Sequence, residues 1–162
     1  MNKGQLPLSA MRPVDIRTLN EPGLIFPIEK NAPCVAVTLW KEIPTAIVLD
    51  GPHAFTFFKI ENHSRATGLF VPAPEIVVKV GSAVRGESAW DKRGTLILEN
   101  GCAHVIGSMA GSSWSDPVNI PLWQQVETEQ ASGKVVGFSG WSLRIPDGLS
   151  SHTIWEFAEP ES

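Results

Sequence analysis

Four histidines and the carboxylates near them are the side chains of this chain that could ligate a metal ion. A first-row metal site in a β protein needs roughly three imidazole or carboxylate ligands that converge. Side chains two residues apart on a strand share a face, so Glu61 and His63 could point the same way, and His104 could meet them from another strand. The sequence has no H-x-H pair. The simpler interpretation is therefore favoured, in which His63 is a polar loop residue and His104 a half-exposed hairpin residue.

Motifs with an established chemistry are absent from the sequence. It contains no phosphate-binding loop, H-E-x-x-H, C-x-x-C or EF-hand loop. The segment GSMAG at 107–111 differs from a nucleophile elbow because Ser108 stands second in it rather than third. Glu87 and Asp91 could share acid and base roles, but a solvated turn is the favoured interpretation for them.

The six tryptophans, which stand beside no tyrosine, are the other candidates for a site. Exposed aromatic rings stack on flat ligands and anchor protein interfaces. Trp90 in ESAWDKRG and Trp114 in GSSWSD have polar, turn-like surroundings, so we expect them at a contact surface. The competing interpretation is that each ring folds back over a sheet end. Strand or helix packing accounts for Trp40, Trp123, Trp141 and Trp155.

Short strands must position these side chains. The chain has 14 glycines and 13 prolines in 162 residues, and only 19% of its residues are charged. From Gly23 onward, apolar and β-branched runs follow one another between turn residues: GLIFPIE, CVAVTLWK, TAIVLD, AFTFFKIE, TGLFV, EIVVKV, TLILE and CAHVIGS. Such spacing predicts an all-β domain of about ten strands, a β-sandwich or jelly-roll-like barrel with at most one or two short helices.

Asn100-Gly101 is the clearest turn, because a two-residue type I′ hairpin favours this dipeptide. It predicts that Glu99 pairs with Cys102 and that Leu98, Ile97 and Leu96 pair with Ala103, His104 and Val105. One face of the hairpin is then wholly apolar core. The other face is mixed, and we expect it to be partly exposed.

Two further segments can be placed. Asp50-Gly51 ends TAIVL and returns the chain into AFTFFKIE, whose aromatic residues occupy both strand faces; this indicates a covered central strand or a bulge. Residues 121–131 fit a short helix that Pro121 opens, or a hairpin arm that turns before KVVGF, and the helix is slightly favoured. In KVVGFSGWSLRI, Ser139-Gly140 indicates a bulge or tight turn.

We expect one β domain over 23–158, an extended N-terminal arm over 1–22 and a frayed acidic C-terminus over 159–162. The N-terminus lacks the apolar core of a signal peptide, and no run is long enough to span a bilayer, so a cytoplasmic location is expected. Cys34 and Cys102 are then reduced; one disulfide between them is the alternative for an exported protein.

The leading hypothesis is a non-catalytic binding or self-associating module that recognises a small molecule, a glycan or a protein partner through Trp90 and Trp114. A net charge of −4 with scattered cations argues against nucleic acid and membrane partners. Low charge with 43% hydrophobic residues predicts a homo-oligomer with an apolar interface.

Two alternatives compete with this hypothesis. The first is a small cupin-like metal-dependent enzyme acting on a small molecule through Glu61, His63 and His104, although the cupin H-x-H pattern is not matched. The second is a structural domain of a virion or surface array. The sequence indicates no cofactor; a divalent transition metal is implied only by the enzyme hypothesis.

Overall fold

A computed structural model describes residues 11–28, 32–60, 67–84, 92–99, 102–111, 117–125, 136–147 and 149–158. These residues form fourteen strands and one turn of 3-10 helix, η2 (Ile16–Thr18), which confirms the all-β prediction. The strands are β1 (Arg12–Asp15), β2 (Gly23–Pro27), β3 (Val35–Trp40), β4 (Ile43–Val48), β5 (Thr56–Lys59), β6 (Thr67–Pro72), β7 (Glu75–Val78), β8 (Ala83–Val84), β9 (Leu96–Glu99), β10 (Cys102–Met109), β11 (Val118–Gln125), β12 (Val136–Phe138), β13 (Gly140–Asp147) and β14 (Ser150–Ala158).

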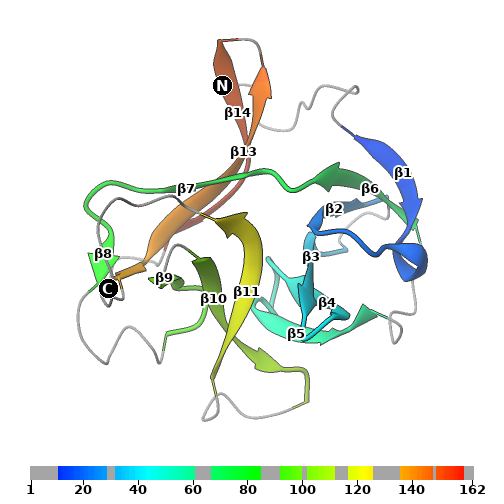
Figure 1. Cartoon of the computed structure of the whole chain (residues 1–162), viewed down its shortest axis with the longest axis horizontal. Coiled ribbons are helices and arrows are strands. Elements are labelled where there is room, and N and C mark those ends of the chain that lie inside the picture. Colours follow the sequence, from blue (N-terminus) through cyan, green and yellow to red (C-terminus); the bar gives the residue numbers. More distant parts are fainter. Residues whose placement is uncertain are drawn as a thin grey trace.

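The strands form two sheets (Figure 1). The larger sheet has eleven strands in the order β1-β6-β2-β3-β4-β5-β10-β9-β12-β8, with β11 also paired to β10. The smaller sheet has the order β14-β13-β7. All neighbours are antiparallel except β5 and β10, which run parallel where Ser108 and Met109 meet Thr56 and Phe57. This parallel contact joins the N-terminal half of the large sheet to its C-terminal half.

The β9–β10 hairpin has the predicted register. Cys102 pairs with Glu99, and the three predicted pairs that follow are all present. Leu96, Ala103 and Val105 on the apolar face are buried, which confirms that face as core. On the mixed face Cys102 and His104 are half-buried as expected, whereas other members are more deeply buried than expected: Thr95 and Ile97.

Two apolar clusters lie on opposite faces of the N-terminal half of the large sheet. The main core joins Leu24 and Phe57 to Trp141 and Leu143 of β13. The second core lies on the other face. Phe55 and Phe57 enter the first cluster, whereas Ile60 enters the second with Phe58 packed against it. The two-faced pattern of AFTFFKIE therefore comes from a strand that is covered on both sides.

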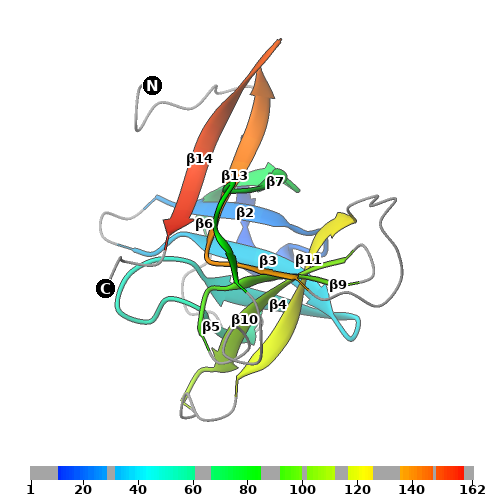
Figure 2. The ribbon, with the colours of Figure 1, turned by 90° about the vertical axis from the view of Figure 1, so that its left-hand side faces the viewer.

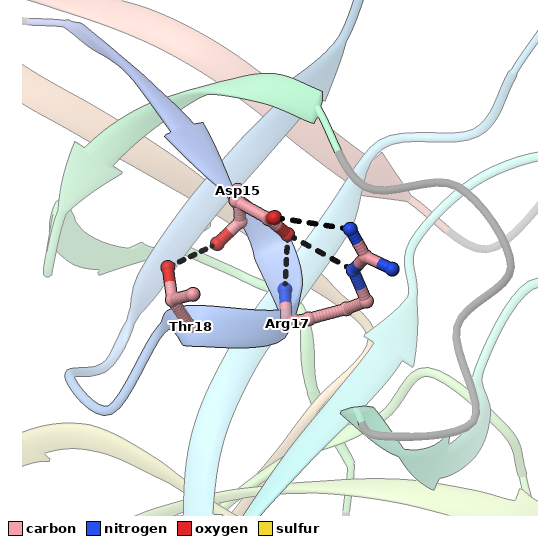
Figure 3. Close-up of polar contacts among 3 residues, drawn as sticks. All are labelled: Asp15, Arg17 and Thr18. Atoms are coloured by element: carbon pink, nitrogen blue, oxygen red, sulfur yellow. Dashed lines mark hydrogen bonds and ion pairs between the residues drawn. The ribbon is translucent and has the colours of Figure 1, made fainter.

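The N-terminal segment adds a strand to the large sheet and a 3-10 turn that packs on the second core. β1 pairs with β6, and Ile16 is buried in the second core. Asp15 caps η2: its Oδ1 accepts from the backbone N–H of Arg17 at 2.9 Å, its carboxylate accepts two bonds from the Arg17 guanidinium, and its carbonyl accepts from Thr18 (Figure 3). The hydrogen bonds from the Arg17 side chain lower the pKa of Asp15.

The slight preference for a helix over 121–131 is wrong for the part that is described. β11 pairs antiparallel with β10, and its Ile120 is buried. A register shift opposite Cys102 and His104 breaks the alternation of β11, so that Leu122 and Trp123 both pack against the main core. That loss of alternation removes the sequence pattern of a strand. Residues 126–131 lie outside the described residues.

The small sheet ends in a hairpin that extends away from the main sheet in both views (Figures 1 and 2). β7 pairs only with the first half of β13, from Trp141 to Arg144, and β14 pairs along the whole of β13. Ser139 separates β12 from β13, at the predicted Ser139-Gly140 break. Within the part of the chain that the structure describes, no helix has the length and apolar character needed to cross a membrane.

Candidate functional site

The candidate site is a cleft of about 710 Å³ where β3, β4, β5 and the end of β10 meet. Small-molecule sites typically enclose about 300–1,000 Å³. The described residues that line the cleft are Trp40, Lys41, Ile43, Thr45, Phe57, Phe58, Lys59, Met109 and Ala110.

Backbone pairing places these residues together. The β3–β4 hairpin pairs Trp40 with Ile43, and β4 pairs Thr45 with Lys59 of β5. The end of β10 is held on the other side of β5, because the Ala110 N–H donates to the Phe57 carbonyl at 3.0 Å. The cleft therefore continues the face that forms the main core, at a point where side chains no longer fill it.

Aromatic rings form the apolar wall of the cleft. The rings of Trp40 and Phe57 meet edge to face, with centroids 5.0 Å apart. Phe57 is buried and Trp40 half-buried, so the tryptophan presents part of its ring to the cleft. Ile43 and Met109 are 43% and 57% exposed. These exposed apolar groups would lose contact with water if a ligand filled the cleft, which favours the binding of an apolar molecule.

The turn that connects β3 to β4 carries strain at the edge of the cleft. Lys41 and Glu42 have φ angles of 52° and 65°, as both central residues of a type I′ turn require. Asparagine and glycine normally occupy such positions, because a left-handed conformation costs other residues about 1–2 kcal/mol. In this turn the ammonium Nζ of Lys41 lies 5.2 Å from the centroid of the Trp40 ring.

We expect the double variant Lys41→Asn/Glu42→Gly to be more stable than the natural chain by about 1 kcal/mol, because it relieves this strain. Chemical denaturation measures the free energy of unfolding. Lys41→Gln/Glu42→Gln is the matched control, since it removes the same charges and keeps the strain. An equal gain in both variants would show that charge, rather than backbone conformation, is responsible.

The described lining of the cleft is positively charged although the whole chain is acidic. Lys41 and Lys59 are its only charged residues among the described lining residues, and neither forms an ion pair within the described part of the chain. Glu42 is exposed and does not line the cleft. The described lining residues include no carboxylate, imidazole or thiol. The cleft thus offers apolar contact and positive charge.

Most of the site residues predicted from sequence fall outside the described residues: Trp90, Trp114, Glu61 and His63. His104 is described. It lies between Ile97 of β9 and Pro121 of β11, and its buried Nδ1 has no hydrogen-bond partner among the residues that the structure describes. Among the described residues, no three histidine, cysteine or acidic side chains are grouped so that they could hold a metal ion.

The two cysteines are both free thiols. Cys34 is 5% exposed, and burial, with a smaller effect from Asp50, raises the pKa of its thiol. The backbone N–H of Cys34 donates to Asp50 Oδ1 at 2.9 Å, which fastens the start of β3 to the turn after β4. Cys34 is therefore a structural residue and a poor nucleophile.

Sequence reasoning missed the cleft. The strand pattern around Trp40 predicts packing alone, whereas its ring packs against the main core and also lines the cleft. Lys41 and Glu42 are not turn-forming residues, so the tight hairpin that places Lys41 beside Trp40 gave no signal. The one indication was the dense apolar run CVAVTLW, which the charged pair Lys41-Glu42 follows at once.

The comparisons with known proteins bear on the family of the chain. No curated protein and no solved structure matches it. Residues 13–161 match the model of one family, described as "Uncharacterised protein y4lG". This match covers nearly the whole chain, from β1 to beyond β14. The chain belongs to the y4lG family.

Proposed function

We propose that this protein is a non-catalytic binding module that holds a small, largely apolar molecule in the cleft against Trp40 and Phe57. The observation that carries the proposal is the cleft itself, with its volume of about 710 Å³ and its aromatic wall. Three of its lining residues keep apolar side chains partly or largely exposed: Trp40, Ile43 and Met109. Binding would remove this surface from water at a gain of about 25 cal/mol per Å².

Support for binding without catalysis comes from the chemistry of the lining. General acid–base catalysis needs a positioned side chain whose pKa lies near the working pH, and nucleophilic catalysis needs an activated nucleophile beside a base. Thr45 carries the one hydroxyl among the described lining residues, and it already donates to the Ile43 carbonyl at 3.0 Å. The described walls therefore supply contact surface and charge for a ligand.

The contact surface at Trp90 and Trp114, self-association and a cytoplasmic location all stay predictions. Trp90 and Trp114 remain the expected contacts for a larger ligand or a protein partner. Self-association is still expected from the composition. A cytoplasmic location remains expected, and it agrees with Cys34 and Cys102 both being free thiols.

The proposal is tested with phenylnaphthylamine, a neutral aromatic probe that becomes fluorescent in apolar sites. We expect one probe to bind per chain, and Trp40→Ala to weaken binding by about tenfold because it removes aromatic contact. Trp40→Phe keeps an aromatic wall and should retain most of the affinity. Fluorescence titration at constant protein concentration gives the dissociation constants.

Leu149→Ala is the matched control, because Leu149 is fully exposed and does not line the cleft. It should leave the dissociation constant unchanged. If Trp40→Ala does not fold, Ile43→Gln tests the same wall at a more exposed position. Unchanged binding in both cleft variants would show that the probe binds elsewhere and that the proposed function is wrong.

A further inference from the structure

We infer that the ligand of this cleft is an organic anion, in which an apolar or aromatic body packs on Trp40 and Phe57 and an acidic group lies between Lys41 and Lys59. This inference rests on the proposed function and adds the chemical class of the ligand. It commits to a small molecule with a carboxylate, sulfonate or phosphate group.

The positions of the two lysines support this class. Lys59 lies opposite Thr45, and Lys41 follows Trp40 directly, so both lysines belong to the same end of the β3-β4-β5 sheet. Both line the cleft, and no acidic residue among the described lining residues offsets them. The two lysines make the described part of the lining electrostatically complementary to a negative ligand.

The aromatic wall supports the rest of the ligand. The edge-to-face pair of Trp40 and Phe57 leaves part of the indole available, and aromatic groups stack or pack edge-on against such a surface. The Lys41 ammonium rests near the Trp40 ring, which is a weak interaction at an exposed position. An anion that binds beside the ring can therefore attract this ammonium, because little interaction energy with the ring is lost when the ammonium moves.

The strained turn is a second, independent observation. Lys41 keeps a left-handed φ of 52° where asparagine or glycine would relieve the strain. Strained residues cluster at ligand sites, where the surrounding structure holds them in a fixed position. The strain at Lys41 is explained if its ammonium has to lie at the cleft in order to contact the anionic group of the ligand. Lys41 is then a specificity residue for the anionic group.

Two probes with the same aromatic body test the inference: anilinonaphthalene sulfonate, which is anionic, and the neutral phenylnaphthylamine. We expect the natural chain to bind the sulfonate about fivefold more tightly than the neutral probe, from roughly 1 kcal/mol of charge interaction at a solvated site. Lys41→Gln/Lys59→Gln should abolish this preference, so that the ratio of the two dissociation constants falls close to one, because only the sulfonate loses a charge interaction. Rising salt should reduce the preference in the natural chain.

Lys79→Gln is the matched control, since Lys79 is exposed and does not line the cleft. It should keep the full preference for the sulfonate. Equal affinity for the two probes in the natural chain, with Trp40→Ala weakening both, would overturn the anion inference and leave the proposed function standing. Failure of Trp40→Ala to weaken either probe would overturn the proposed function itself.

Discussion

Replacing Trp141 with alanine should lower the free energy of unfolding by about 3–5 kcal/mol, the range for removing a buried aromatic ring. Trp141 is 2% exposed and packs against the Trp155 ring, with centroids 4.6 Å apart. Its indole Nε1 donates to the Gly94 carbonyl at 2.7 Å. One side chain of the small sheet thus fills the main core and is bonded to the segment that leads into β9. The loss is measured by urea denaturation monitored by circular dichroism.

Trp141→Phe separates packing from hydrogen bonding. It keeps an aromatic ring but leaves the Gly94 carbonyl without its donor, and an unpaired buried polar group costs about 1–3 kcal/mol. Its effect should therefore fall between that of the natural chain and that of Trp141→Ala. Leu149→Ala, at a fully exposed position, should change stability by less than about 0.5 kcal/mol. Typical single substitutions lower the free energy of unfolding by about 1 kcal/mol. A loss no larger than this in Trp141→Ala would contradict the role given to Trp141 in the core.

Local patterns in the sequence were sufficient to predict local structure. Asn100-Gly101 lies outside the described residues, but the register that it predicts for β9 and β10 is present in the described pairs. The mixed aromatic pattern of AFTFFKIE indicated two covered faces, and Phe57 and Ile60 do lie in different cores. Turn signals and strand propensity act over a few residues, so a single sequence is enough to recognise them.

Features that depend on distant contacts could not be predicted in this way. The register shift in β11 hid a strand behind a pattern that resembled a helix. The cleft depends on β10 meeting β5 in parallel, a pairing of residues far apart in the chain that no local pattern encodes. Phe55 makes this pairing: its φ is 65°, and its carbonyl accepts from the Ser108 N–H at 3.0 Å. A left-handed phenylalanine cannot be foreseen from propensity.

The Lys41-Glu42 turn shows the same limit at the site itself. Here the sequence departs from the residues that the backbone favours, so propensity argues against the turn that is present. Such departures are expected where a side chain is kept for what it contacts. The candidate site thus lies where sequence reasoning is weakest.

Replacing Gly94 with alanine should destabilise the protein by about 2–4 kcal/mol through two separate effects. Gly94 has a φ of +85°, a conformation that costs a residue with a Cβ about 1–2 kcal/mol. An added Cβ would also lie 2.5 Å from the Phe55 ring and 2.7 Å from the Phe157 ring. Phe55 is buried in the main core, and the half-buried Phe157 packs against it with ring centroids 4.9 Å apart; overpacking of this kind typically costs about 1–3 kcal/mol. The free energy of unfolding is obtained from urea denaturation.

Gly81→Ala isolates the first of these effects, because Gly81 has the same φ of +85° and no atom within 4 Å of an added Cβ. Its loss of stability should equal the backbone strain alone, and the excess in Gly94→Ala is then the overpacking. Shortening the obstructing side chain as well, in Gly94→Ala/Phe157→Leu, should recover part of that excess, since the two changes are in contact and do not add. Equal losses of free energy of unfolding in Gly94→Ala and Gly81→Ala would contradict the overpacking, because they would mean that the rings around Gly94 shift to make room for the methyl group.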